Sequence, residues 1–264
     1  MVNNIAFPGL GLSFDVNRVA FYIHGKPIYW YGIIIAAGFF LALIYVLSVC
    51  GKKDVKKDNV YDIAIYALVC GIIGARIYYV IFDFDSVRGS FLNFFAVWNG
   101  GLAIYGGIIG GALSTYVYCR RKNISFAKTA DLLAPGLLIG QAVGRWGNFF
   151  NSEVYGRTTD IFCRMSINGT DGVHPLFLYE SIWNIIGLVL YIIFDKKFRK
   201  HDGEGICFYA IWYGVGRFFL ESMREPAYIL YLKEPVGISH VVSAAAVITA
   251  VVIMFVLRRK KENV

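Results

Sequence analysis

Long apolar segments recur along the whole chain, and their length constrains the fold more than any other feature. A helix needs about 20 mostly apolar residues to cross the hydrocarbon core of a bilayer. Seven segments approach or exceed this length: 28–49, 60–82, 93–118, 130–149, 175–194, 206–223 and 238–257. The third and fourth are rich in glycine and carry polar residues, so hydropathy supports them least. The pattern predicts an all-α integral membrane protein with about seven transmembrane helices.

Composition points to the same class of protein. The 264 residues are 57% hydrophobic and 17% charged, whereas soluble domains carry about 25% charged residues. The first residues lack the basic segment and short apolar core of a removable signal peptide. We therefore expect a single integral membrane domain over residues 1–264.

The basic residues are distributed unevenly between the connections. Sixteen of the 26 Lys and Arg residues follow the first, third, fifth and seventh segments, four in each place. Basic loops are retained in the cytoplasm. This predicts an N-terminus outside, a cytoplasmic C-terminus, and a small extracytoplasmic cap formed by the long polar connection 150–174. The net charge of +8 is then a topology signal and not a nucleic-acid-binding patch.

Five cysteines are scattered through the chain with no CxxC pair. Most fall in or beside apolar segments, where cysteine is usually a small packing residue. Neither a disulfide framework nor a metal site is expected.

Several charged side chains lie inside the apolar segments, where a charge is expensive unless it faces a polar cavity or a partner. The predicted orientation places them toward the non-cytoplasmic side, together with Tyr31, Asn99 and Tyr105. These charged residues are Arg76, Arg145, Glu180, Arg217 and Glu221. Arg217, Glu221 and Arg224 have the spacing of one helix face. Two fixed guanidinium groups in an outward-facing pocket suit a phosphate.

Other interpretations remain open at this point. Arg217 and Glu221 could form a structural pair, and Arg76 could extend to the lipid headgroups. The glycines of the third segment favour close helix packing over ligand contact. An anion transporter or channel, and a non-catalytic lipid-binding or scaffold protein, also accommodate buried charge. We find no internal repeat of the kind that many transporters contain.

The run Gly144-Arg145-Trp146-Gly147-Asn148-Phe149-Phe150-Asn151-Ser152-Glu153-Val154-Tyr155-Gly156 resembles the signature of the bacterial prolipoprotein diacylglyceryl transferases. Further runs match in the same order and cover the chain from the first segment to the last. They are Tyr29-Trp30-Tyr31-Gly32, Gly74-Ala75-Arg76-Ile77-Tyr78-Tyr79, Trp98-Asn99-Gly100-Gly101, His174-Pro175 with Tyr179-Glu180-Ser181, and Tyr213-Gly214 through Arg217, Glu221, Arg224 and Pro226.

The resemblance implies an enzyme of the bacterial plasma membrane whose active site faces the extracytoplasmic side. Such an enzyme transfers a diacylglyceryl group from phosphatidylglycerol to the lipobox cysteine thiol of a prolipoprotein, as the first step of lipoprotein maturation. A thioether forms and glycerol phosphate leaves. No cofactor and no metal is expected.

The resemblance also suggests roles for individual residues. Arg145 and Arg217 would bind the phosphate of phosphatidylglycerol, with further substrate contacts from Asn148, Gly156 and Arg76. Glu153 and Glu221 would orient the arginines. Tyr31 or Tyr105 would position the thiol. Many family members have a histidine where this chain has Tyr105, so the resemblance names no general base.

Overall fold

The structure is a computed structural model that describes residues 2–82 and 100–259. The described chain divides into two compact units. The first comprises residues 1–45 and 133–264, and the second comprises residues 46–132. Each unit is considered by itself below.

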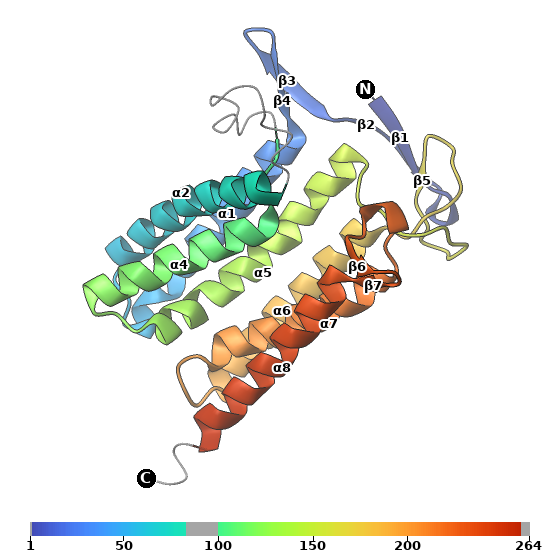
Figure 1. Cartoon of the computed structure of the whole chain (residues 1–264). Coiled ribbons are helices and arrows are strands. Elements are labelled where there is room, and N and C mark those ends of the chain that lie inside the picture. The colour runs from blue at the N-terminus through green and yellow to red at the C-terminus, as the bar shows by residue number, and fades with distance from the viewer. Residues whose placement is uncertain (1, 83–99, 260–264) are drawn as a thin grey trace. The chain divides into compact units, whose positions relative to one another are not determined.

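Seven α-helices of 19 to 26 residues make up most of the described chain. They are α1 (Trp30–Val49), α2 (Lys57–Phe82), α4 (Ile104–Lys122), α5 (Phe126–Asn151), α6 (Leu176–Lys197), α7 (Glu204–Ser222) and α8 (Ile238–Arg259). Each overlaps one of the predicted segments. In the first unit α7 packs between α6 and α8, and in the second α2 packs on α4 (Figure 1).

Four helical stretches are long and apolar enough to cross a membrane by themselves: residues 30–53, 57–82, 176–197 and 238–259. Many of their large apolar side chains are exposed, including Ile44, Ile65 and Ile248. Such surfaces are stable in lipid, and the chain therefore has the character of a membrane protein. The remaining helices α4, α5 and α7 are less apolar because they carry glycine and polar residues.

The prediction of an all-α chain was wrong for the N-terminal segment and for part of the connection 150–174. β1 (Val2–Phe7) pairs antiparallel with β2 (Leu12–Asn17) and with β5 (Ser166–Ile167). Strand β1 buries Ile5 and Phe7, two residues apart, as expected for a strand with one face in a core. These side chains pack with Val16, Met165, Val173 and Phe177. The N-terminus is thus bound to residues 165–177, which no local sequence pattern indicated.

Two hairpins complete the strands. β3 (Val19–Ile23) and β4 (Lys26–Tyr29) are joined by His24 and Gly25, which both have positive φ, as a two-residue hairpin turn requires. The hairpin leads directly into α1. β6 (Tyr231–Lys233) and β7 (Val236–Gly237) form the second hairpin, which leads into α8.

Helix α4 begins at Ile104 and not at residue 93 as predicted; residues 93–99 lie outside the described residues. Gly100 and Gly101 have φ of 86° and 72°, which no right-handed helix contains. Arg76 donates hydrogen bonds from Nη1 to both of their carbonyl oxygens, at 2.9 Å each. The carbonyl oxygens of the glycine pair are therefore bound by a side chain of α2.

Glycines of α4 are packing residues, as the sequence favoured. A Cβ on Gly106 would overlap the carbonyl oxygen of Gly74, and one on Gly110 would overlap that of Cys70. The two helices are consequently antiparallel and in close backbone contact.

Helices α6 and α7 are held by a reciprocal tryptophan pair. Trp183 donates to the carbonyl oxygen of Trp212 and Trp212 donates to that of Trp183, each over 3.0 Å. Their rings stack at a centroid distance of 4.4 Å. Gly187 and Gly216 leave the space that the two rings occupy. This pair fixes the register between the helices that carry Glu180 and Arg217.

An ion pair lies at the N-terminal end of α7. Arg258 of α8 donates to both carboxylate oxygens of Glu204, from Nε at 3.0 Å and from Nη2 at 3.2 Å. The backbone N–H of Lys200 donates to the same carboxylate. Glu204 is completely buried, and its contacts join the α6–α7 connection to the end of α8.

Candidate active site

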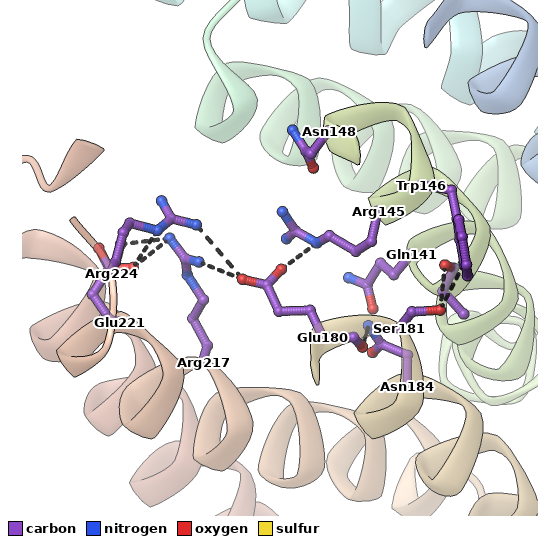
Figure 2. A network of polar contacts seen from close by, with 12 residues as sticks. Gln141, Arg145, Trp146, Asn148, Glu180, Ser181, Asn184, Arg217, Glu221 and Arg224 are labelled. Carbon is purple, nitrogen blue, oxygen red and sulfur yellow. Dashed lines mark hydrogen bonds and ion pairs between the residues drawn. The ribbon is translucent and has the colours of Figure 1, made fainter. Parts of the chain in front are cut away.

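Five charged side chains of the first unit converge on one place (Figure 2). We call them the arginine–glutamate cluster: Arg145, Glu180, Arg217, Glu221 and Arg224. They come from the last third of α5, the first turn of α6, and the end of α7 and the residues after it. All five are largely buried, and the side chain of Glu221 is only 1% exposed.

Glu180 is the centre of the cluster. One carboxylate oxygen pairs with Nε of Arg145. The other lies 3.4 Å from Nη1 of Arg217 and 3.6 Å from Nη2 of Arg224. A single carboxylate thus contacts three guanidinium groups, one from α5 and two from the end of α7 and the residues after it.

Glu221 contacts Arg217 of α7 and Arg224, which follows the helix. Its Oε2 lies 2.7 Å from Nη2 of Arg217 and 3.5 Å from Nε of Arg224. Arg217 also donates to the hydroxyl of Ser239 at the start of α8, over 3.3 Å. The i, i+4, i+7 spacing therefore does place these three residues on one face.

The cluster contains three guanidinium groups and two carboxylates, so it carries an excess of one positive charge. Some of its polar atoms also lack a well-oriented hydrogen-bond partner, among them Nε of Arg224. A buried excess charge is costly without a counterion. The arrangement is therefore suited to an anionic ligand.

Polar side chains continue one helical turn away from the cluster on all three helices. Gln141 precedes Arg145 by four residues, Asn184 follows Glu180 by four, and Tyr213 precedes Arg217 by four. Gln141 donates to the hydroxyl of Tyr209 over 2.7 Å, and Asn184 donates to the carbonyl oxygen of Glu180 over 2.8 Å. Glu180, Asn184, Tyr213 and Arg217 border a small cavity. Polar side chains thus extend from the cluster along α5, α6 and α7.

The signature run beyond Arg145 forms a second set of contacts. Glu153 accepts hydrogen bonds from the side-chain amides of Asn148 and Asn151, over 3.3 and 3.1 Å. No ion pair joins Glu153 to an arginine within residues 2–82 and 100–259. The expectation that Glu153 orients an arginine is therefore not supported. Its carboxylate instead fixes the two asparagines at the end of α5.

Tyr31 packs beside this run. A Cβ on Gly147 would lie 2.7 Å from the Tyr31 ring, so the absence of a side chain at Gly147 makes room for the ring. Tyr31 interacts electrostatically with both Glu153 and Arg145. It therefore lies close to Arg145 of the arginine–glutamate cluster.

Gly156 connects the segment after α5 to the cluster through the backbone. It forms a β-bridge with Arg224, and its N–H donates to the carbonyl oxygen of His174 over 2.9 Å. A Cβ there would meet His174 and Met223 at 2.6 and 2.7 Å. Close packing therefore requires a glycine at this position, independently of any contact with the substrate.

His174 precedes α6 and lies 3.4 Å from the hydroxyl of Tyr179. Burial lowers the pKa of His174 from its ordinary value of 6.5. Burial therefore favours the neutral form of the imidazole.

Two predicted site residues, Arg76 and Tyr105, belong to the second unit. Arg76 is buried and is bound to Gly100 and Gly101, and its guanidinium lies 5.5 Å from the centroid of the Tyr79 ring. Tyr105 packs against Tyr78, with ring centroids 6.4 Å apart. The contacts of Arg76 within its unit are those of a structural residue. Asn99 lies outside the described residues.

Sequence reasoning gave no site role to Glu180 or Arg224. Both were noted as charges near the other candidates, but the three arginines that contact Glu180 lie 35 to 44 residues from it and cannot be deduced from helix spacing. One signal in the sequence could have indicated them as site residues, because arginines outnumber glutamates among the charges of the apolar segments.

Comparison with known proteins decides the family. The family described as "Prolipoprotein diacylglyceryl transferase" matches residues 18–256. The chain belongs to the prolipoprotein diacylglyceryl transferase family. It is therefore an enzyme, and the transporter and scaffold interpretations are set aside.

Individual members of the prolipoprotein diacylglyceryl transferase family match nearly the full length. A protein of Clostridioides difficile is 39% identical, over 94% of this chain and 98% of its own length. One of Enterococcus faecalis is 40% identical, over 93% and 92%. One of Listeria innocua is 41% identical, over 79% of each chain. All three are named phosphatidylglycerol–prolipoprotein diacylglyceryl transferase.

Proposed function

We propose that this chain transfers the diacylglyceryl group of phosphatidylglycerol to the lipobox cysteine thiol of bacterial prolipoproteins, with the arginine–glutamate cluster as its phosphate-binding centre. The observation that carries the assignment is the excess positive charge of a buried cluster in a chain of this family. Phosphatidylglycerol has a singly charged phosphodiester, which matches that excess.

The reaction joins the cysteine sulfur to the glyceryl carbon and breaks the bond from that carbon to the phosphate oxygen. The bonding electrons leave with glycerol phosphate, which becomes a monoester of higher negative charge. Guanidinium groups fixed beside the phosphate therefore stabilise the transition state more than the ground state. We assign this role to Arg145 and Arg217. Both pair with Glu180, and Arg217 also pairs with Glu221.

Asn148 and Tyr31 border the same region. Glu153 orients the Asn148 amide, which then presents a donor or an acceptor to the lipid or the peptide. The thiolate is the nucleophile, and a free cysteine has a pKa of about 8.5. Tyr31 is suited to positioning the thiol, whereas a tyrosine with a reference pKa of about 10 is a weak base near neutral pH. The general base is left unassigned.

The topology we propose has seven spans, with the N-terminus outside and the C-terminus in the cytoplasm. Helices α4, α5 and α7 are then spans as well. The buried charges of α5 and α7 pair with Glu180 and Glu221 and need not face lipid. Residues 150–174, together with the paired strand β1, form the extracytoplasmic cap. The arginine–glutamate cluster lies at that side, where the lipobox cysteine emerges, in the bacterial plasma membrane.

A direct assay tests the function. Purified protein with phosphatidylglycerol and a lipobox peptide should yield a peptide heavier by one diacylglyceryl group, detected by mass spectrometry. A peptide with serine in place of the cysteine is the control and should stay unmodified. An unmodified cysteine peptide, with protein shown to be folded, would contradict the proposal.

The protein's own cysteines provide a second control. All five are free thiols, and none contacts the cluster in the described residues. The protein should retain turnover when Cys50, Cys70, Cys119, Cys163 and Cys207 are all changed to Ala or Ser, because the reacting thiol belongs to the prolipoprotein. A lipid trapped covalently on one of them would contradict direct displacement.

The topology is tested with the cysteine-free protein. Asp171→Cys, in the proposed cap, should react with a membrane-impermeant maleimide on intact cells. His201→Cys, in the α6–α7 connection, should react only after the cells are opened. The reverse labelling pattern would overturn the orientation.

A further inference from the structure

A groove runs along the second unit between α2 and α4, which lie side by side (Figure 1). It has a volume of about 580 Å³ and is lined by residues of these two helices. On α2 they are Tyr66, Cys70, Ile73, Gly74 and Ile77, which recur with the period of one helix face. Residues of α4 from Gly110 to Lys122 line it with the same period. The groove is therefore a continuous seam between two helices.

The side chains give the groove a floor and two walls. Gly74, Gly110 and Ser114 are small and half-buried, and form the floor. Ile73 and Leu113 stand beside them and are 52% and 59% exposed. An apolar channel of this shape suits a hydrocarbon chain, which needs close packing and no hydrogen bonds.

The length of the groove matches the thickness of the hydrocarbon layer of one leaflet. Tyr66 and Ile77 are eleven residues apart, which corresponds to roughly 16 Å along an α-helix. Half of the hydrocarbon core of a bilayer is about 15 Å thick. A chain lying in the groove would thus extend from a headgroup to the bilayer centre.

One end of the groove is cationic. Arg121 and Lys122 line it there and are exposed. The Nζ of Lys122 lies 5.9 Å from the centroid of the Tyr118 ring. The nearby acid, Asp62, accepts a hydrogen bond from the Tyr118 hydroxyl over 2.7 Å. Among the described residues, no ion pair involves Arg121 or Lys122.

We propose that this groove binds an anionic phospholipid of the cytoplasmic leaflet, with the phosphate on Arg121 and Lys122 and an acyl chain along the seam between α2 and α4. The site is separate from the residues assigned to catalysis and does not depend on their roles. Basic residues at the membrane surface attract anionic lipid roughly five-fold each. A zwitterionic lipid would fill the apolar part equally well but would gain little at the cationic end.

The test uses photoreactive lipids, one phosphatidylserine and one phosphatidylcholine, each with a diazirine in an acyl chain. Phosphatidylserine is chosen because it is anionic without being phosphatidylglycerol, the donor of the reaction. The full-length protein is reconstituted in vesicles that contain one probe, irradiated and digested. Peptides from residues 66–77 and 110–122 should carry several times more adduct from phosphatidylserine than from phosphatidylcholine.

Variants separate the two ends of the site. Arg121→Ala with Lys122→Ala should remove most of the phosphatidylserine preference, and 1 M salt should do the same because it shortens the screening length to about 3 Å. Arg120→Ala is the matched control, since Arg120 is exposed at the same helix end but does not line the groove, and should retain the preference. Ser114→Phe should reduce adducts of both probes on these peptides by filling the floor. Equal labelling by both lipids in the unmodified protein would overturn the anionic site, and absence of adducts from both peptides would overturn the groove as a lipid site.

Discussion

The arginine–glutamate cluster and the Glu204–Arg258 pair occupy opposite ends of α7, about 25 Å apart along the helix, and differ in charge balance. In the pair, one guanidinium meets one carboxylate through two hydrogen bonds, and a backbone N–H completes the contacts. In the cluster, three guanidinium groups share two carboxylates, and some polar atoms lack partners. The positive and negative charges of the pair balance without a ligand, whereas those of the cluster do not. Buried charge alone therefore does not mark a functional site, but an uncompensated excess of it does.

The largest expected effect lies in the cluster. Arg145→Ala or Arg217→Ala should each reduce turnover by roughly 10²- to 10³-fold, the loss typical of removing one group that stabilises transition-state charge. The lipobox-peptide assay measures turnover, and thermal unfolding checks that the variants are folded. Arg258→Ala is the control, since it removes an arginine that pairs with the buried carboxylate of Glu204, and turnover per folded molecule should stay near normal. Near-normal turnover in both cluster variants would remove the phosphate-binding assignment.

A substitution that disturbs the tryptophan pair should reduce turnover more than a substitution in the Glu204–Arg258 pair. In Gly216→Ala, the new methyl group would overlap Trp183 and displace α6 from α7. Overpacking of this kind costs about 1–3 kcal/mol of stability. Because Arg217 is the next residue, turnover should also fall by at least several-fold at temperatures where the variant is folded. Unchanged turnover in a destabilised variant would show that the register between α6 and α7 is not critical for the site.

Substitutions of Arg224, the third arginine of the cluster, test whether the excess positive charge is needed for activity. Arg224 makes longer contacts, of 3.5 and 3.6 Å, so its loss should be milder than that of Arg217. Arg224→Gln balances the cluster and should weaken use of phosphatidylglycerol roughly ten-fold, at the low end for one charged hydrogen bond. Arg224→Lys keeps the charge and should recover part of the loss. Equal activity of the Gln and Lys variants would show that charge balance is not what defines this site.

The smallest effect on activity belongs to the Glu204–Arg258 pair. Glu204→Gln would remove one partner of a buried pair, but Arg258 is 41% exposed and can be rehydrated. We expect a loss of about 1–2 kcal/mol in unfolding free energy, less than for a fully buried pair. Turnover per folded molecule should be unchanged. Replacing both partners by leucine should be less harmful than Glu204→Gln, and thermal unfolding would measure the difference.

The helices of this protein could be predicted from sequence because their determinants are local. Apolar segments of about 20 residues predicted all seven long helices of the described chain, and α8 begins at the predicted residue, 238. The spacing of Arg217, Glu221 and Arg224 placed them on one face, since helix geometry alone decides this. Motif resemblance identified the family for the same reason, because it needs only the order of residues.

Other features depend on partners far away in the sequence. Strand β1 is short and only weakly patterned, and it forms because β2 and β5 offer it hydrogen bonds and Val16, Met165 and Phe177 cover its apolar face. The start of α4 at Ile104 depends on the hydrogen bonds from Arg76 to Gly100 and Gly101. Neither could be deduced from the residues of the segment itself.

By itself, the sequence determined that the chain is a helical membrane protein of a known family, because hydropathy, helix period and motif order are properties of neighbouring residues. Only the tertiary structure decided which buried charges meet. In the sequence Glu180 is an isolated charge near the start of α6, and packing places its carboxylate among three arginines from other segments. Coulombic interactions depend on distance in space, and the fold alone sets that distance.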